Sequence, residues 1–243
     1  MRPVAFFPLN GQYDTADISL RSNPPGLSKD VNLAPGPDGS AGGSYQFSGN
    51  STSFITFPNN GGLHTTYSFT FLAWIYHEEV KGPIFYYADP AAELGSFGNK
   101  FLFNEGRFKT TIRQMSNFTK LTSLSSDILE PQTWHFVGVT YNYVSGEVKI
   151  WLNGSEHKDK IVSWPWQTAT RQSVLMGSAS GSAGNFKGRI SCVQLYDRDL
   201  TKLEIEGAKW LCFTAGKTFL PRNFTTIPLV IKLIQGSRQT LIS

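Results

Sequence analysis

Pairs of carboxylates are the first residues in this sequence whose spacing could support a reaction. Glycoside hydrolysis needs two of them about 5 to 10 Å apart, one on each side of the bond that breaks. On a strand, acidic residues two positions apart would share a face and meet this need. The chain offers Asp197-Arg198-Asp199, which is typical of a turn, and Glu204-Ile205-Glu206. The second pair falls in a predicted helix, where residues two apart do not share a face, so neither predicts a glycosidase.

Other reactive groups lack the partners that their chemistry needs. His77-Glu78 does not continue into the zinc motif HExxH, because Lys81 stands where the second histidine should be. The sequence contains neither the nucleophile motif GxSxG nor the phosphate-binding motifs GxxxxGK[ST] and GxGxxG. We therefore expect that the protein is not an enzyme and has no catalytic residues.

Cysteine and asparagine patterns bear on the compartment. Cys192 and Cys212 either form a disulfide bond or are two unrelated buried thiols, and their spacing fits neither a CxxC motif nor a zinc site. Four asparagines stand in Asn-X-Ser/Thr acceptor sites: Asn50, Asn117, Asn153 and Asn223. Together these features favour an extracellular glycoprotein. No signal peptide is visible at the proline-broken N-terminus, so we expect one module of a longer secreted or membrane-anchored protein.

Three tryptophans are candidates for contacts with a ligand. Trp164 and Trp166 flank Pro165 in a polar, loop-like stretch, and Trp151 faces away from the apolar side of its strand. Indole rings stack on the C–H faces of sugars and contribute strongly to protein interfaces. The alternative is structural, because a tryptophan is usually mostly buried under a loop or against a second sheet.

Charge and hydropathy exclude two kinds of partner. The net charge of +4 comes from 22 basic and 18 acidic residues. The whole excess lies in the last thirty residues, at Lys217, Arg222, Lys232 and Arg238. A balanced body without a basic stripe predicts no binding to nucleic acid. The longest apolar run, 227–231, is far shorter than the roughly 20 residues of a membrane helix, so the chain is not expected to span a membrane.

Alternating apolar residues predict an all-β protein. In 67–76, Phe69, Phe71 and Ile75 share one face while Leu72 and Trp74 occupy the other, which predicts a central strand. Turn signals separate the expected strands at intervals that suit a sandwich or barrel. These strands are 4–9, 44–47, 54–57, 67–76, 83–88, 100–104, 107–112, 133–142, 147–152, 173–176 and 188–196.

Two local signals define a turn and a helix. Asn153-Gly154 is a strong signal for a tight turn after a strand. Thr201-Lys202-Leu203-Glu204 fits a helix capping box, in which the glutamate reaches back to the first residue. The capping box predicts one short helix between the two cysteines.

Several strings along the chain are together similar to a known domain family. They are Phe7-Pro8-Leu9-Asn10-Gly11, Tyr45-Gln46-Phe47-Ser48-Gly49, 68–76, 134–141, and 186–190 followed by Leu195-Tyr196-Asp197. Over residues 4 to 213 the sequence resembles a laminin G-like domain, and more narrowly a pentraxin-like jelly roll. The resemblance implies a two-sheet antiparallel jelly-roll sandwich of the concanavalin A-like lectin and glucanase superfamily. It also implies adhesion or recognition, with glycans or matrix proteins as partners and Ca²⁺ in many members.

The resemblance does not carry over site residues. Glucanases of this superfamily present a Glu-X-Asp-X-Glu string or a one-residue expansion of it, which is absent here and disfavours a glycoside hydrolase. Calcium needs six to eight oxygen ligands, and Cys192 stands in the stretch where such domains often carry an acidic residue. Six aspartates lie in expected loops: Asp14, Asp17, Asp30, Asp38, Asp197 and Asp199. Calcium binding stays open, with solvated loop aspartates as the alternative and the metal ligands unknown.

The sequence thus predicts one laminin G-like domain over 1–213 and a basic tail over 214–243. The tail is a linker, an added edge strand or an artefact of the chain end. The predicted function is an extracellular, non-catalytic recognition or adhesion module that binds glycans or matrix and cell-surface proteins. If the protein binds neither glycans nor Ca²⁺, the remaining prediction is a module for protein-protein adhesion or a spacer.

Overall fold

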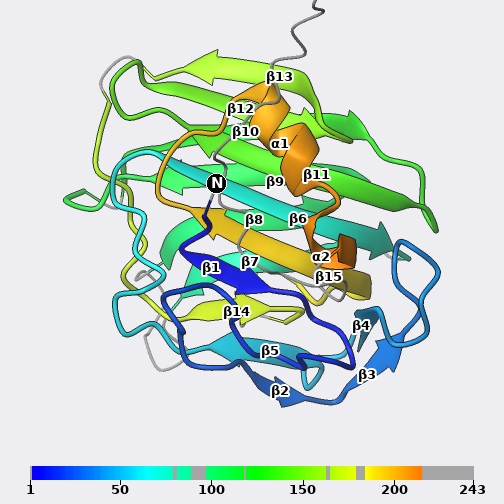
Figure 1. Cartoon of the computed structure of the whole chain (residues 1–243). Coiled ribbons are helices and arrows are strands. Elements are labelled where there is room, and N and C mark those ends of the chain that lie inside the picture. Colours follow the sequence, from blue (N-terminus) through cyan, green and yellow to red (C-terminus); the bar gives the residue numbers. More distant parts are fainter. Residues whose placement is uncertain are drawn as a thin grey trace, which may run out of the picture.

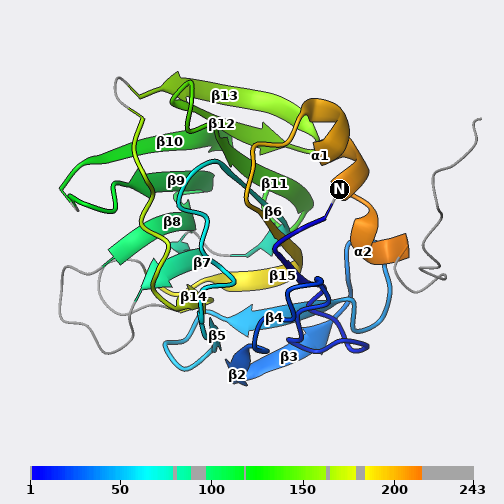
Figure 2. The ribbon, with the colours of Figure 1, turned by 60° about the vertical axis from the view of Figure 1, so that its left-hand side comes forward.

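The computed structural model describes residues 2–78, 81–88, 97–117, 119–162, 165–178 and 184–214. Its strands form two sheets that face each other, as Figure 1 and Figure 2 show. Neighbouring strands are antiparallel in both sheets. The predicted jelly-roll sandwich is therefore confirmed.

The two sheets are named here by the order of their strands in space. Sheet I contains β13 (Ser155–Ile161), β12 (Glu147–Leu152), β11 (Trp134–Tyr141), β6 (Phe69–His77), β15 (Lys187–Tyr196), β4 (Ser44–Ser48) and β3 (Val31–Ala34), with β1 (Ala5–Phe7) paired to β15. Sheet II contains β10 (Leu121–Ile128), β9 (Arg107–Arg113), β8 (Phe97–Asn104), β7 (Lys81–Ala88), β14 (Val174–Met176), β5 (Phe54–Phe57) and β2 (Leu27–Lys29). Helices α1 (Lys202–Ala208) and α2 (Leu211–Thr214) lie over the outer face of sheet I.

The space between the sheets holds the main hydrophobic core. Phe69 and Phe71 of β6, which were predicted to share a face, both point into it, and Phe71 stacks on Phe101 of sheet II with ring centroids 4.5 Å apart. Alternate residues of β12, Val148 and Ile150, enter the same core. The period of two along each strand therefore assigns every second side chain to the interior.

A second hydrophobic cluster covers the outer face of sheet I. Leu72 and Trp74 of β6 and Phe136 of β11 pack there against Ile205 of α1. The Trp74 indole nitrogen donates to the backbone oxygen of Lys209, 3.0 Å away, at the end of α1. Strand β6 is thus buried on both faces, and the prediction that it is central is confirmed.

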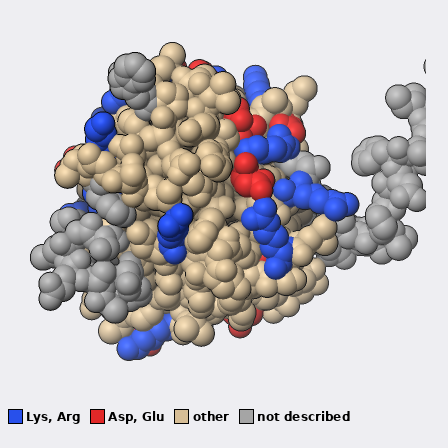
Figure 3. Space-filling model, turned by 90° about the vertical axis from the view of Figure 1, so that its left-hand side faces the viewer, with Lys and Arg blue, Asp and Glu red and all other residues tan. Residues whose placement is uncertain are grey.

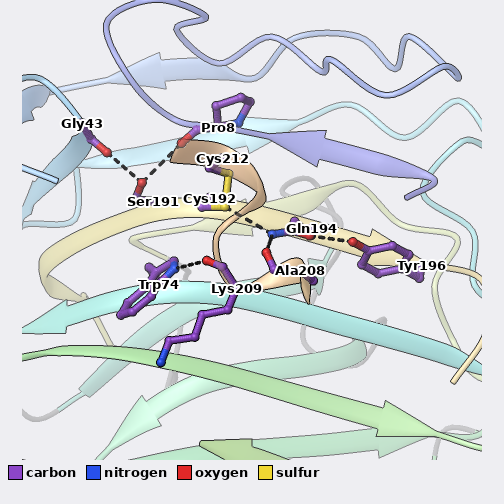
Figure 4. The surroundings of a disulfide bond; sticks show 10 residues. All are labelled: Pro8, Gly43, Trp74, Ser191, Cys192, Gln194, Tyr196, Ala208, Lys209 and Cys212. Atoms are coloured by element: carbon purple, nitrogen blue, oxygen red, sulfur yellow. Dashed lines mark hydrogen bonds between the residues drawn. A yellow bond between two sulfur atoms is a disulfide. The ribbon is translucent and has the colours of Figure 1, made fainter. Parts of the chain in front are cut away.

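The disulfide bond joins this helical segment to a bulge in β15. Ser191 pairs with Trp74 and Gln194 with Leu72, so Cys192 and Val193 together oppose one residue of β6. Cys192 takes φ of +55° at this bulge and is bonded to Cys212 of α2 (Figure 4). The alternative of two unrelated thiols is therefore excluded.

Gln194 connects sheet and helix beside the disulfide bond. Its side chain is fully buried, and its amide nitrogen donates to the Ala208 oxygen at 3.0 Å (Figure 4). Its amide oxygen accepts a hydrogen bond from the Tyr196 hydroxyl at 2.6 Å. A buried amide stabilises a fold only when its donors and acceptors are satisfied, so Gln194 fixes where α1 ends.

Four strands were not expected from the sequence, and each is an edge strand. Strands β3 and β13 are the edges of sheet I, and β2 and β10 are those of sheet II. Their side chains are largely exposed, and β13 carries the polar sequence Ser-Glu-His-Lys-Asp-Lys-Ile. Polar side chains on an edge strand discourage pairing with another chain. They also remove the apolar alternation from which a strand can be predicted.

The predicted turn and helix are both present. Asn153 and Gly154 have φ of +54° and +95°, the conformation of a tight hairpin turn, between β12 and β13. Helix α1 begins after Thr201, whose backbone N–H donates to the Glu204 carboxylate at 2.9 Å.

Removing the disulfide bond should lower stability measurably. In the chain-entropy model, a bridge across about 20 residues contributes about 3 kcal/mol by restricting the unfolded chain. We expect the double variant Cys192→Ser/Cys212→Ser to lose about this much free energy of unfolding in urea titrations. Reductant should bring the parent protein to the same level and leave the variant unchanged. Equal stability of the oxidised parent and the variant would contradict the prediction.

Candidate functional site

A hollow of about 320 Å³ lies on the outer face of sheet I. It forms where β11, β12 and β13 meet the segment that leads from β15 into α1, and we call it the outer groove. Its lining combines one indole with charged, amide and hydroxyl groups. The lining residues are Thr140, Asn142, Glu147, Lys149, Trp151, Glu156, Asp199, Leu200, Thr201 and Lys202.

Strand register brings these side chains together. On β12, Lys149 and Trp151 point outward because Val148 and Ile150 enter the core. Lys149 pairs across the strands with Thr140 of β11, and Trp151 pairs with Glu156 of β13. Because the strands form a continuous sheet, this part of the groove has a rigid base.

Trp151 contributes to the base of the groove. Its predicted outward direction is confirmed, but the ring is only 5% exposed because it belongs to the cluster beneath α1. Its indole nitrogen donates to the Thr140 hydroxyl at 3.0 Å. Of the two alternatives for Trp151, burial thus describes most of the ring, and a ligand could meet only the small part that lines the groove.

Charged groups in the groove are held by one another. The Lys149 ammonium lies 3.2 Å from the Glu147 carboxylate and 3.1 Å from that of Glu156. Although partial burial lowers the pKa of Lys149, hydrogen bonds to Glu156 and Glu147 outweigh burial and raise this pKa above its usual value. The Asn142 amide donates to the Asp199 carboxylate at 2.8 Å. These contacts fix donors and acceptors before any ligand arrives.

The wall formed by the start of α1 depends on an ion pair. Arg198 binds both oxygens of the Glu204 carboxylate, at 3.0 and 2.5 Å. This hydrogen bonding, with a further hydrogen bond from the Thr201 backbone, lowers the pKa of Glu204 to about 2. Arg198 and Glu204 thereby hold the segment that carries Asp199 into the groove.

Trp166 does not line the outer groove. Trp166 is half-buried, and its backbone exchanges hydrogen bonds of 3.0 and 2.9 Å with the Tyr141 hydroxyl. Its indole nitrogen is buried without a hydrogen-bond partner in the described part of the chain. Trp164 falls outside the described residues. Of the two described tryptophans among the three candidates, only Trp151 lines the outer groove.

The predicted glycosylation sites are on the surface where they are described. Asn50, Asn117 and Asn153 are exposed, and Asn223 lies outside the described residues. Asn153 also has a structural contact, because its side-chain oxygen accepts the Phe136 N–H at 3.0 Å.

Three of the six aspartates considered for calcium bind different partners. Asp17 accepts hydrogen bonds from Phe6 and Asn23, Asp197 pairs with Arg21, and Asp199 accepts from Asn142. Across the ranges that the structure describes, no group of three metal-binding side chains gathers at one point. Calcium binding stays a prediction, and we derive no role for calcium from these aspartates.

Aromatic residues that the sequence did not single out are more open than Trp151. Trp210, between α1 and α2, is 51% exposed, and Tyr76 and Trp134 of sheet I are half-buried. For Tyr76 and Trp134 the only signal in the sequence is their outward position on a strand, which does not tell a covered ring from an open one.

Charges of both signs occur together on the surface. On the face in Figure 3, most of which is uncharged, basic and acidic side chains lie beside each other at the upper right. Neither sign forms a stripe of its own there. No helix in the described ranges is long and apolar enough to cross a membrane.

The family follows from a match over most of the chain. Residues 48–206 match the model of the concanavalin A-like lectin/glucanases superfamily, and the chain belongs to this family. No curated protein sequence is significantly similar to it.

Two solved binding domains have a similar fold. The binding domain of Paraclostridial Mosquitocidal Protein 1 is similar with a TM-score of 0.67 and 16% identity, over 85% of this chain and 51% of that one. The ligand binding domain of botulinum neurotoxin serotype D, in complex with N-acetylneuraminic acid, gives 0.66 and 15%, over 84% and 50%. The chain thus spans about half the length of these toxin domains.

A further solved structure matches over nearly its full length. Domain 4 of AbnA, an extracellular arabinanase from Geobacillus stearothermophilus, in complex with arabinotriose, gives a TM-score of 0.63 and 16% identity, over 85% of this chain and 98% of that one. At such identities the likeness concerns the fold.

The lowered pKa of Glu204 predicts a pH-dependent contribution to stability. The pKa falls from 4.5 to about 2 on folding, so the contribution is complete above pH 4.5 and is lost as pH falls towards 2. We expect Glu204→Gln to lower the free energy of unfolding at pH 7 by about 1 kcal/mol, since the side chain is 31% exposed and screened by solvent. Denaturation at pH 7, 4 and 2 measures this difference, which should vanish at pH 2.

Glu206→Gln is the matched control for this prediction. Glu206 lies on the same helix but is exposed. Its carboxylate is as far as 3.9 Å from the Lys202 ammonium, and a surface ion pair of this kind contributes little to stability. It should change stability little at any of the three pH values. If Glu204→Gln lowered stability equally at all three pH values, the effect would not come from the ionised Glu204 carboxylate.

Proposed function

We propose that this protein is a non-catalytic glycan-binding module and that the outer groove holds the glycan. The observation that carries the proposal is the lining of the groove. It presents the edge of Trp151 beside fixed groups that can donate to and accept from sugar hydroxyls. A concave site with a few convergent polar groups is the usual form of a small-ligand site.

The structural neighbours support this proposal. Domain 4 of the arabinanase matches along almost its whole length, and its structure is a complex with arabinotriose. The toxin domain in complex with N-acetylneuraminic acid is about twice as long as this chain. Its ligand therefore supports a glycan-binding function for this chain less directly.

The same groove also contains the only specific argument for a hydrolase. Glu147 and Glu156 contact the same ammonium and are close enough for the carboxylate pair of a glycosidase, about 5 to 10 Å apart. The Lys149 ammonium, however, occupies the space between them, where the glycosidic bond would have to lie. We therefore propose binding without hydrolysis.

Binding should depend on groove residues that lie outside the core. We expect Asn142→Ala and Glu156→Ala each to weaken binding about ten-fold, since each removes a hydrogen-bonding group from a site with charged partners. A glycan array would identify binders, and calorimetry with arabinotriose and the best array glycan would give the affinities. Lys109→Ala on sheet II is the control and should bind like the parent.

Two results would count against this proposal. Undiminished affinity in both groove variants would remove the groove as the site. If the protein released reducing ends from a bound polysaccharide and Glu156→Ala abolished this release, the groove would be the active site of a hydrolase. An array without any binder would favour the second candidate, an adhesion module for extracellular proteins.

We further propose that the protein works outside the cell. A disulfide bond persists in oxidising compartments, and the described acceptor asparagines are exposed. Both features suit a secreted protein or the ectodomain of a membrane protein.

This proposal predicts N-glycosylation. After passage through a eukaryotic secretory pathway, Asn50, Asn117 and Asn153 should carry glycans because their acceptor sites are on the surface. Intact mass before and after enzymatic deglycosylation, with the variants Asn50→Gln, Asn117→Gln and Asn153→Gln, assigns each site. A secreted protein of unmodified mass would contradict the prediction.

A further inference from the structure

A row of outward side chains crosses sheet I away from the outer groove. The register places Gln46 of β4 beside Arg189 of β15, Arg189 beside Tyr76 of β6, and Tyr76 beside Trp134 of β11. We call these four residues the outer row. All four are half-buried, so each retains an accessible part.

The outer row begins with an aromatic pair at the margin of the helices. The rings of Tyr76 and Trp134 lie with centroids 5.6 Å apart. The neighbouring outward pair, Trp74 and Phe136, is buried in the cluster with α1 and α2, which Figure 1 shows over the front of this sheet. The Trp134 and Tyr76 rings are therefore the part of this aromatic surface that the helices leave partly open.

Arg189 is fixed over the aromatic pair. The central carbon of its guanidinium lies 4.6 Å from the centroid of the Tyr76 ring. Its Nε donates to the Gln46 side-chain oxygen at 2.9 Å, and Gln46 in turn donates to Glu78 at 3.2 Å. The amide of Gln46 thus stands between the guanidinium and the nearest carboxylate of this network.

These contacts leave the terminal nitrogens of Arg189 available. In the described chain, Arg189 contacts Gln46 through Nε and Tyr76 through its planar face, and it has no ion-pair partner. A guanidinium whose two terminal nitrogens are free presents a planar fork that matches a carboxylate. Because the fork is already oriented, little conformational entropy is lost when it binds.

We propose that the outer row is a second binding site, which takes a carboxylate-bearing sugar of an acidic glycan. The sugar carboxylate pairs with the terminal nitrogens of Arg189, and the C–H face of a sugar ring stacks on Trp134. The inference goes beyond the proposed function, because it concerns a different surface and does not require a ligand in the outer groove.

The length of the row favours more than one sugar. From β11 through β6 and β15 to β4 there are three strand spacings, or about 14 Å in all. Gln46 and Glu78 at the far end offer an amide and a carboxylate to the hydroxyls of a neighbouring sugar. A short acidic oligosaccharide therefore fits the row better than a single sugar.

Matched ligands test the role of the carboxylate in the full-length protein. We would measure affinities for a hyaluronan hexasaccharide and for 3′-sialyllactose, each beside its methyl ester. The parent protein should bind at least one acid about ten-fold more tightly than its ester, because the ester cannot form the charged pair. Arg189→Gln should remove this difference, and Trp134→Ala should weaken acid and ester alike.

Two further variants separate the planar fork of Arg189 from its charge and from general effects of substitution. Arg189→Lys keeps the charge and the fold but loses the planar fork, so it should lose most of the preference for acid over ester. Lys109→Ala on sheet II, a residue of neither proposed site, should leave acid binding unchanged. Failure of the parent to bind either acid, equal binding of acid and ester, or parent-like preference in Arg189→Gln would each overturn the proposal.

Discussion

Strand β15 has two different neighbours along one of its edges, and this constraint shapes the whole outer face of sheet I. Its first part pairs with β4 and its last part with β1, while its other edge follows β6 throughout. The bulge at Cys192 and Val193 takes up the mismatch by placing two residues against one. The same bulge turns the Cys192 sulfur outward, where the disulfide bond holds α2 against the sheet.

The site candidates are consequences of this arrangement. Because α1 and α2 are anchored at the bulge and at Gln194, they cover the middle of the outer face and convert it into a second core. On one side the segment before α1 rises beside β12 and encloses the outer groove. On the other side the cover ends, and Tyr76 and Trp134 remain partly open. A rigid sheet therefore supplies the base, and the position of two short helices decides which parts of it a partner can reach.

Strands with strong alternation, such as β6 and β12, were predictable because each inward side chain is apolar. The four edge strands were not, since polar edges carry no such pattern. The helix after Thr201 was predictable from its capping box. The role of Trp151 was only half predictable, because parity on a strand gives the direction of a side chain and says nothing of what covers it. The partners of Arg189 lie on β4 and β6, and strand register brings them together in a way that sequence spacing does not reveal.

The position of β15 near the end of the described chain has a consequence for biosynthesis. Ala5 pairs with Leu195, so β1 and β15, the first and last described strands of sheet I, must meet before the sheet is complete. Until the ribosome has released β15, β4 and β6 have no common neighbour, and the aromatic side chains of β6 remain without cover on the helical side. Such long-range pairing makes folding slow and leaves apolar surface exposed meanwhile. We therefore expect a nascent chain to expose the outer face of sheet I until β15 and the disulfide bond are in place.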